Sequence, residues 1–295
     1  MKSYNCFTTC HCYLNWNILK ILRKTLDLKI KDKVAFVTGG GQGVGRRICL
    51  QLAEEGVKVA VNDFFAERAE AVVAEIRQAG GTAVAAPADI TDSADIDAAF
   101  DKVVSVLGPV DILVNNAGVT VARRTKGGMA PTFLETTPPD WKEIIDLNIW
   151  GMLHCVNKVL PAMKARRWGK IVNIMSEAGR AGEARLAVYS GAKAAMLGFA
   201  KAIAQEHGRD CINVNTIALG AVSHEGIKSG ALNPEATPEN NERLGKMLKA
   251  YPIATGLQRL CKPEDIAPMV CLLASDRAAY ITGQSIGVNG GFVMI

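Results

Sequence analysis

Residues 34–45 read VAFVTGGGQGVG, an apolar run that ends in a glycine-rich turn. Glycines at positions 39, 43 and 45 permit a tight turn and let backbone N–H groups approach an anion closely. The residues after the turn have the apolar spacing of a helix. A turn between a first strand and a first helix is where a dinucleotide places its pyrophosphate. We therefore predict a dinucleotide-binding turn here, with a purely structural glycine turn as the alternative.

From this turn to the end of the chain, short apolar segments alternate with amphipathic ones. The pattern predicts strands at 34–39, 58–63, 83–90, 110–118, 170–176, 212–219 and 281–291, and helices at 45–56, 66–81, 93–108, 139–169, 188–207 and 262–275. Such alternation indicates a parallel sheet that helices cover on both faces. The predicted fold is one α/β domain over residues 31–295, a Rossmann-type doubly wound parallel sheet.

The composition suits a globular domain without a nucleic-acid or membrane role. The 295 residues are 49% hydrophobic and 21% charged, with a net charge of +5. The charge excess lies within the first 33 residues, so the remainder is close to neutral and shows no nucleic-acid footprint. No apolar run approaches the roughly 18 residues of a membrane span. The later cysteines are scattered singly, as in a reducing compartment, and we expect a cytoplasmic protein.

Residues 1–30 differ in character from the rest of the chain. They are basic, and LNWNILKILRKTLDLKIK (14–31) has amphipathic spacing, which is also a feature of transit peptides and surface anchors. We interpret residues 1–30 as an extension outside the catalytic domain, whose deletion we expect to leave activity intact. Its Cys6, Cys10, His11 and Cys12 match no zinc spacing. The remaining histidines are isolated, so we predict no metal site.

Further motifs follow the turn in a fixed order. They are NNAG at 115–118, Ser176 at the end of a predicted strand, and YSGAK at 189–193. With TGGGQGVG at 38–45, this set resembles the short-chain dehydrogenase/reductase family over residues 33–295. ITGQSIGVNGG at the C-terminal end is similar to that family's last segment. The resemblance implies a nicotinamide-dependent oxidoreductase that interconverts secondary alcohols and ketones.

The resemblance also assigns catalytic roles to Asn148, Ser176, Tyr189 and Lys193. A phenol has an ordinary pKa of about 10, too high for a base near neutral pH. An ammonium four residues further along shares the helical face and favours the phenolate. The implied roles are Tyr189 as acid and base, Lys193 as the group that lowers its pKa and binds the nicotinamide ribose, Ser176 as the group that orients the substrate oxygen, and Asn148 as holder of a water. Taken singly, each residue would be read as packing or as surface.

The cofactor prediction depends on Asp63, which ends the second predicted strand. A carboxylate there accepts hydrogen bonds from the adenosine ribose and repels a 2′-phosphate. Phe64 and Phe65 follow, so no neighbouring cation compensates, and the sequence favours NAD over NADP. Asp89 and Ile90 resemble the family's adenine-contacting pair. The predicted cofactor-binding residues are Gly39, Gln42, Gly43, Val44, Gly45, Asp63, Asp89, Ile90, Asn116, Ala117, Gly118, Tyr189, Lys193, Gly220 and Val222.

One segment departs from the family pattern. After the sixth strand the family usually has Pro-Gly and then a threonine that holds the cofactor carboxamide. This chain has ALGAVSHE (218–225), with Leu219 at the proline position, Gly220 retained and His224 at the threonine position. Ser223 is a neighbouring hydroxyl that would substitute. We expect atypical nicotinamide binding or lid closure rather than loss of function.

Residues 119–139 and 221–258 follow predicted strands and are expected to form the substrate cleft, the second as a lid. Arg123, Arg124 and Lys126 would attract an anionic substrate, and solvated loop charge is the alternative. The lid and C-terminal residues resemble dehydrogenases of hydroxyacyl thioesters. This favours an NAD-dependent oxidoreductase for a hydroxyacyl-CoA or hydroxy acid.

Other functions stay open on the sequence alone. They are a 3-oxoacyl-acyl-carrier-protein reductase that uses NADPH, a sugar or polyol dehydrogenase, and a non-catalytic NAD-binding regulator on the same fold. Family members are usually dimers or tetramers joined through the helices near 140–166 and 190–206. We therefore expect a homo-oligomer with a small-molecule substrate.

Overall fold

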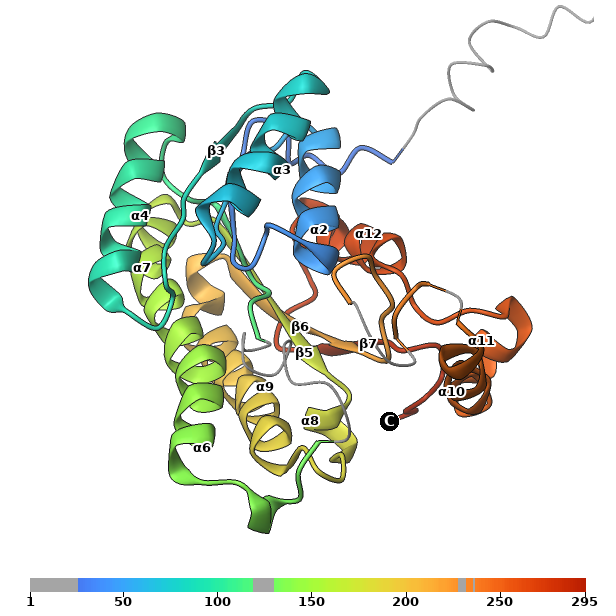
Figure 1. Cartoon of the computed structure of the whole chain (residues 1–295). Helices are drawn as coiled ribbons and strands as arrows, with labels where there is room; N and C mark the ends of the chain where they lie inside the picture. The colour runs from blue at the N-terminus through green and yellow to red at the C-terminus, as the bar shows by residue number, and fades with distance from the viewer. Residues whose placement is uncertain (1–25, 119–129, 228–231, 236) are drawn as a thin grey trace, which may run out of the picture.

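The computed structural model describes residues 26–118, 130–227, 232–235 and 237–295. In this part of the chain a seven-stranded sheet has the order β3-β2-β1-β4-β5-β6-β7, and all of its strand pairs are parallel (Figure 1). The strands are β1 (Val34–Val37), β2 (Lys58–Val61), β3 (Ala83–Ala85), β4 (Ile112–Asn115), β5 (Gly169–Ser176), β6 (Ile212–Leu219) and β7 (Ser285–Val288). The strand order reverses between β1 and β4, the place where open α/β sheets bind ligands. The predicted doubly wound parallel fold is confirmed.

Helices connect these strands and cover both faces of the sheet. They are α2 (Gly43–Glu54), α3 (Ala66–Gln78), α4 (Ser93–Leu107), α6 (Pro138–Ile145), α7 (Gly151–Arg166), α8 (Ala178–Ala181), α9 (Ala187–His207), α10 (Pro238–Leu248), α11 (Pro252–Leu257) and α12 (Pro263–Leu273). Short 3₁₀ turns are η1 (Phe133–Glu135), η3 (Gly208–Asp210) and η4 (Asp276–Ala278). The helix predicted over 139–169 is interrupted by a π-helical turn, η2 (Asp146–Trp150).

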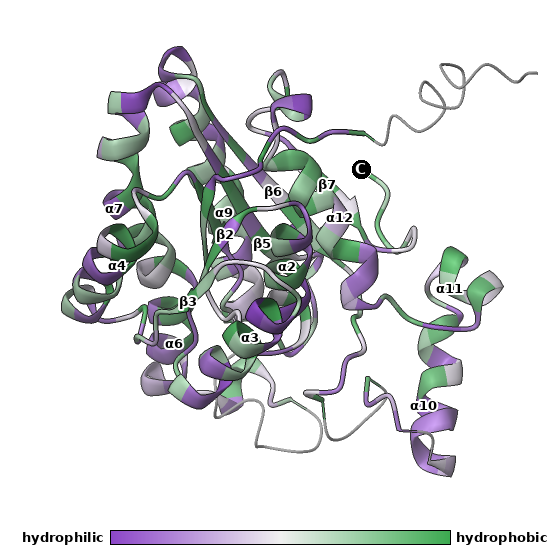
Figure 2. Cartoon of the chain, turned by 90° about the horizontal axis from the view of Figure 1, so that it is seen from above, coloured by the Kyte–Doolittle hydropathy of each residue, from purple (hydrophilic) through white to green (hydrophobic). Residues whose placement is uncertain are grey.

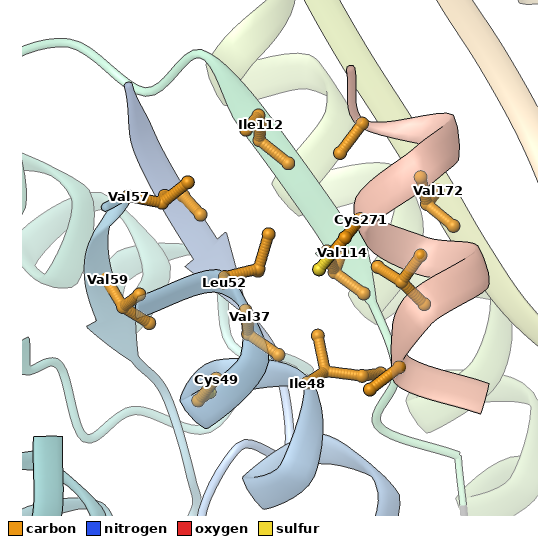
Figure 3. Close-up of a cluster of buried hydrophobic side chains, with 14 of the residues drawn as sticks. Val37, Ile48, Cys49, Leu52, Val57, Val59, Ile112, Val114, Val172 and Cys271 are labelled. Atoms are coloured by element: carbon orange, nitrogen blue, oxygen red, sulfur yellow. The ribbon is translucent and has the colours of Figure 1, made fainter. Parts of the chain in front are cut away.

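The core has two halves because successive residues of a strand point to opposite faces. Val37 packs with α2, α3 and α12 in one buried cluster, part of which Figure 3 shows. Phe36, its neighbour, packs with α4, α7 and α9 in the other cluster and stacks on Phe100 with ring centroids 4.2 Å apart. With both faces covered, the strands read as continuous apolar runs rather than as alternating patterns. Helix α10 lies at the edge of the fold, and much of it is hydrophilic in Figure 2.

The carboxyl ends of the parallel strands share one edge of the sheet. Thr38 follows β1, Asp63 lies just after β2, Asn116 follows β4, Ser176 ends β5 and Gly220 follows β6. Asp63, Asn116, Ser176 and Gly220 are predicted site residues. Thr38 belongs to the predicted turn, but no separate role was predicted for it. Parallel pairing therefore gathers residues that are far apart in the sequence at a single edge.

No helix in the described part of the chain is both long and apolar enough to span a bilayer. The described residues also contain no group of three or more His, Cys, Asp or Glu side chains placed to hold a metal ion. Cys49, Cys155 and Cys271 are buried free thiols. The three cysteines of the N-terminal segment and the loop charges Arg123, Arg124 and Lys126 lie outside the described residues.

The packed part of the chain begins before the predicted boundary at residue 31. Leu28 and Ile30 are buried, with exposed fractions of 8% and 1%, and both belong to the cluster under α2. Arg277 Nε donates to the Asp27 carbonyl oxygen at 2.7 Å, which connects the segment before β1 to the C-terminal part of the chain. A deletion of residues 1–30 would therefore remove two core side chains.

We predict that Ile30→Ala lowers the free energy of unfolding by about 2–4 kcal/mol, because it leaves a cavity in the core. Leu26→Ala is the matched control, since Leu26 is 65% exposed, and it should change stability by less than about 0.5 kcal/mol. Urea unfolding followed by circular dichroism measures both. Equal losses in the two variants would contradict a packed domain that starts at Leu28.

Candidate active site

A pocket of about 650 Å³ follows the carboxyl edge of the sheet. It brings together most of the residues predicted from the sequence, from the glycine-rich turn at one end to the YSGAK helix at the other. Those that line it are Gly39, Gln42, Val44, Gly45, Asp63, Asp89, Ile90, Asn116, Ala117, Gly118, Ser176, Tyr189, Lys193, Gly220 and Val222. Gly43 and Asn148 are not among the lining residues. Gly43 begins α2 directly after the turn, and Asn148 lies next to Gly118.

The glycine-rich turn leaves no room for side chains where the chain must approach itself. A Cβ atom on Gly45 would lie 2.0 Å from the Gly39 carbonyl oxygen, so the start of α2 packs directly on the turn. Gly39 and Gly43 adopt φ angles of +61° and +52°, which favour glycine. Helix α2 has no acidic residue in its first turn and no side-chain cap from Gln42. Its first N–H groups are therefore suited to an anion.

Hydrogen bonds fasten the NNAG segment to this turn. The Thr38 hydroxyl accepts from the N–H groups of Asn116 and Ala117 at 2.9 and 3.0 Å. The Asn116 side-chain amide donates to the carbonyl oxygens of Thr38 and Gly39 at 3.0 and 3.1 Å. The ends of β1 and β4 are thereby fixed relative to each other. Asn115, one residue earlier, donates to Asn173 on β5 at 2.8 Å.

Asp63 is buried at the end of the pocket beside the turn, with 6% of its surface exposed. Its Oδ2 accepts from the Gly41 N–H at 3.1 Å, and its Oδ1 accepts from the Phe65 N–H at 3.1 Å. The carboxylate is thus held in place by backbone donors. Arg68, which the sequence analysis missed, also lines this end, and its guanidinium lies 4.2 Å from the Phe65 ring centroid.

Lys193 is the most deeply buried cation of the pocket, with an exposed fraction of 3%. Its Nζ donates to the Ile174 carbonyl oxygen on β5 at 3.0 Å and lies 5.8 Å from the centroid of the Tyr189 ring. Burial lowers the pKa of Lys193 to about 8, because desolvation disfavours the ammonium. Lys193 and Tyr189 therefore meet inside the protein and do not form a surface pair.

Asn148 sits in the π-helical turn between α6 and α7 and is 1% exposed. Its Nδ2 donates to the Ile144 carbonyl oxygen at 2.9 Å. Its Oδ1 is buried and accepts no hydrogen bond from any residue that the structure describes. A Cβ atom on Gly118 would lie 2.9 Å from this oxygen and 2.5 Å from Lys193 Nζ, so both groups face the same place. A π turn at such a position is typical of functional sites.

Ser176 and Tyr189 line the pocket from two different elements. Ser176 is the last residue of β5, and its Oγ accepts from the Ala178 N–H at 3.2 Å. Tyr189 lies in the first turn of α9 and is half-buried. Ser190 fixes the start of this helix, since its Oγ accepts from the Glu183 N–H at 3.2 Å. The hydroxyl and the phenol thus have access to the same cavity.

A buried ionic cluster next to Ser176 was not predicted. The Glu177 carboxylate, 2% exposed, accepts from Arg180 Nη1 at 2.9 Å and from Asn289 Nδ2 at 2.7 Å. The Glu177 N–H donates to the Leu219 carbonyl oxygen at 2.9 Å. Asn289 also donates to the Val293 carbonyl oxygen. The end of β5 is therefore tied to β6 and to the C-terminal segment, although no local sequence pattern signals this cluster.

The segment after β6, which the sequence predicted to be a lid, contributes residues to the pocket wall. Leu219, at the family's proline position, completes β6, and Tyr251 accepts a hydrogen bond from the Ala221 N–H at 3.1 Å. The Tyr251 ring stacks on Phe292 with centroids 4.6 Å apart. Apolar side chains face the pocket from this side, namely Ala221, Val222, Ile227, Leu232, Met247, Tyr251 and Phe292. His224, at the family's threonine position, also lines the pocket.

Comparison with known proteins agrees with this geometry. The family described as short chain dehydrogenase matches residues 33–231. The chain belongs to that family. Its members are oxidoreductases that act on CH–OH and keto groups and bind nicotinamide cofactors. The resemblance proposed from the motifs is confirmed.

Several curated relatives match over nearly their whole length. The chain is 39% identical to 3-oxoacyl-acyl-carrier-protein reductase FabG of Staphylococcus aureus over 263 residues, which cover 89% of this chain and 98% of the relative. It is 37% identical to the enzyme of that activity from Synechocystis, over 89% of this chain and 97% of the relative. It is 35% identical to 7alpha-hydroxysteroid dehydrogenase of Escherichia coli, over 90% and 96%.

The lowered pKa of Lys193 has a consequence for stability. In the unfolded chain a lysine stays charged up to its ordinary pKa of about 10.4, whereas folded Lys193 loses its proton near pH 8. The unfolded state binds more protons between these values, so the wild-type free energy of unfolding should rise over this range. We predict that Lys193→Met raises the free energy of unfolding, relative to the wild type, most strongly below pH 8. This difference should decline above pH 8, because the wild type becomes more stable there.

The measurement is urea unfolding from pH 7 to pH 10.5. Lys201→Met on the exposed side of α9 is the control for the loss of a lysine from the same helix. If the free energy of unfolding of both variants showed the same pH dependence relative to the wild type, burial of Lys193 would not be the cause of its lowered pKa.

Proposed function

We propose that this protein interconverts a secondary alcohol and a ketone, with NAD as the preferred nicotinamide cofactor. One observation carries the proposal: Ser176, Tyr189 and Lys193 share a single pocket with the glycine-rich turn. A non-catalytic regulator on the same fold would need the turn but not this set of proton-handling groups. The nearly full-length likeness to reductases and dehydrogenases supports an enzyme as well.

The residues present fit a dinucleotide. Side chains at positions 45 and 118 would clash with the Gly39 carbonyl oxygen and with Lys193, so the pocket has the close backbone approach that such a ligand needs. The N–H groups at the start of α2 would hold the pyrophosphate. Asp63 would accept from the adenosine ribose, and Lys193 would bind the nicotinamide ribose. When bound, the nicotinamide supplies the hydride acceptor or donor.

The protein's own groups would manage the proton. Tyr189 would take the hydroxyl proton during oxidation and return it during reduction. The Lys193 ammonium, buried beside it, stabilises the phenolate more strongly than it would in water. Ser176 would donate to the substrate oxygen and orient it. Asn148 Oδ1, buried and facing the same place as Lys193, would hold the water that returns protons from solvent.

We predict that Tyr189→Phe lowers kcat by about 100- to 10,000-fold, because the phenol is the general acid and base. NADH should still bind, as measured by its fluorescence on titration. Turnover is scored as NADH formation or loss with a panel of secondary alcohols, ketones and hydroxyacyl thioesters. Wild-type-like turnover by Tyr189→Phe would refute the assignment, and binding without turnover by the wild type would favour the regulator.

The preference for NAD rests on Asp63. Its carboxylate is fixed by the Gly41 and Phe65 N–H groups, so it cannot turn away from a 2′-phosphate without losing both bonds. Arg68 lines the same end and would offset part of that repulsion. We therefore propose a preference for NAD rather than complete exclusion of NADP.

We predict that Asp63→Asn shifts kcat/KM toward NADPH, relative to NADH, by about tenfold or more, which corresponds to about 1.4 kcal/mol. Asparagine keeps the shape and removes the charge. Glu67→Gln, an exposed change in the first turn of α3, is the control. A wild-type enzyme that prefers NADPH, or an unchanged ratio in Asp63→Asn, would contradict the role of Asp63.

For the substrate we propose a hydroxyacyl or oxoacyl thioester. The lid side of the pocket is apolar, with Leu232, Met247 and Phe292 among its lining residues, which suits an acyl or alicyclic chain better than a sugar. The names of the reductase relatives point to the same class. A carrier-protein thioester and a coenzyme A thioester carry the same acyl group, so the substrate panel includes both.

We also infer a homodimer or homotetramer that works in the cytoplasm. Exposed apolar side chains on the helices expected to join subunits support this proposal, since Trp150 is 52% exposed and Ile145 is 37% exposed. Sedimentation velocity tests it: a monomer at micromolar concentration would overturn the inference.

A further inference from the structure

Tyr251 brings a second phenol to the pocket wall. It directly precedes α11, is buried with 9% of its surface exposed, and lines the pocket. The base of its ring lies near Gly290, where a Cβ atom would be 3.7 Å from Tyr251 Cδ1. The other end of the ring lies at the end of β6, since a Cβ atom on Gly220 would be 2.8 Å from Tyr251 Cε1. The hydroxyl therefore lies at the strand end, where Gly220 and Ala221 also line the pocket.

The hydroxyl proton of Tyr251 is available for a further partner. The Ala221 N–H donates to the Tyr251 hydroxyl oxygen at 3.1 Å, so the oxygen is the acceptor in this bond. A phenol also carries one O–H donor, and none of the described residues accepts a hydrogen bond from it. The backbone bond thus holds the oxygen in place and leaves the proton for a group that enters the pocket.

The surroundings of Tyr251 favour a donor rather than a base. Burial raises its pKa above the ordinary value of about 10, and the negative charges of Glu183 and Glu177 add to this rise, while the backbone hydrogen bond opposes it. Tyr251 therefore keeps its proton at neutral pH. Tyr189 differs, because the Lys193 ammonium lies beside its ring and favours the phenolate.

Neighbouring strand ends bring Tyr251 close to Ser176. Ser176 and Leu219 are partners in the register of β5 and β6, and adjacent strands lie about 4.8 Å apart. Ala221, which donates to the Tyr251 hydroxyl, follows Leu219 by two residues, at most about 7 Å along the chain. The hydroxyls of Ser176 and Tyr251 therefore belong to the same part of the pocket.

The wall around this hydroxyl is mainly apolar. Leu232 and Met247 pack in the same small cluster as Tyr251, and Phe292 stacks on its ring. All three also line the pocket. In such sites a few placed polar groups fix the orientation of the ligand. A substrate without the matching acceptor would leave the phenol unpaired, which is how a hydrogen-bonding site discriminates strongly.

We propose that Tyr251 donates a hydrogen bond to a second oxygen of the substrate, the thioester carbonyl oxygen of a 3-oxoacyl or 3-hydroxyacyl group. The inference rests on the proposed function, which assigns the reacting oxygen to Ser176 and Tyr189. In such a group the second oxygen lies two carbons from the reacting carbon, so donors at neighbouring strand ends suit it. Tyr251 thereby selects substrates with two oxygens over simple alcohols and ketones.

The test compares two substrates that differ by one oxygen. The 3-oxohexanoyl thioester of N-acetylcysteamine carries the second oxygen, and the thioether with CH2 in place of the thioester carbonyl lacks it. kcat/KM with NADH is measured for the wild type, Tyr251→Phe, Phe292→Leu and Tyr280→Phe. Phe292→Leu removes the ring that stacks on Tyr251 and keeps the phenol. Tyr280 is an exposed phenol and serves as the matched control.

We expect Tyr251→Phe to lower kcat/KM about five- to tenfold for the thioester, the size of one hydrogen bond between neutral groups, and less than about twofold for the thioether. Phe292→Leu should affect both substrates in equal proportion, and Tyr280→Phe should affect neither. An unchanged value for the thioester in Tyr251→Phe would overturn the inference. Equal losses for both substrates would also overturn it, since they would indicate a structural role through Ala221. A wild type that turns over neither substrate would instead overturn the proposed function.

Discussion

Burying a lysine ammonium costs free energy unless polar atoms replace the water that it loses. Lys193 is 3% exposed, and the Ile174 carbonyl oxygen on β5 accepts a hydrogen bond from it. That acceptor exists at the right place because β5 is long and its backbone continues to Ser176. The position of Lys193 fixes the other parts in turn. Gly118 must lack a side chain to leave space for it, and Asn148 faces it from the π turn.

The sheet edge supplies the rigidity that such a site needs. Thr38 and Asn116 join the ends of β1 and β4, and Glu177 joins the end of β5 to Asn289 after β7. The hydrogen bonds of both connections are buried or half-buried, and the low dielectric constant there makes each bond electrostatically stronger than in water. Ser176 and the glycine-rich turn are therefore parts of one framework, and Tyr189 and Lys193 line the same pocket. The described part of the segment after β6 contacts this framework through the Tyr251 hydroxyl, through the His224 ring against Gly43, and through the Ile253 N–H, which donates to the Gly290 carbonyl oxygen at 3.1 Å.

The sequence was informative wherever the chemistry is local. The glycine-rich turn, the NNAG segment and the Tyr189–Lys193 spacing are short patterns whose physical requirements lie within a few residues. The π turn around Asn148 was missed, because a helix period continues through it and only the backbone reveals the extra residue. Glu177 and Asn289 are 112 residues apart, so only the fold brings them together. Leu28 and Ile30 were assigned to a basic extension because their neighbours in the sequence are charged. Their burial depends on residues far along the chain that join them in one core cluster.

The central claim is that this framework transfers hydride between a nicotinamide and a carbon that bears oxygen. Isotope transfer measures that step directly. Wild-type protein is incubated with NADH deuterated at C4 of the nicotinamide, in separate samples for each face, and with a 3-oxoacyl thioester. The expected result is a 3-hydroxyacyl product that carries one deuterium at the carbinol carbon, from one of the two labelled cofactors only. Loss of NADH without deuterium in any product, across thioester and simple ketone substrates, would contradict it.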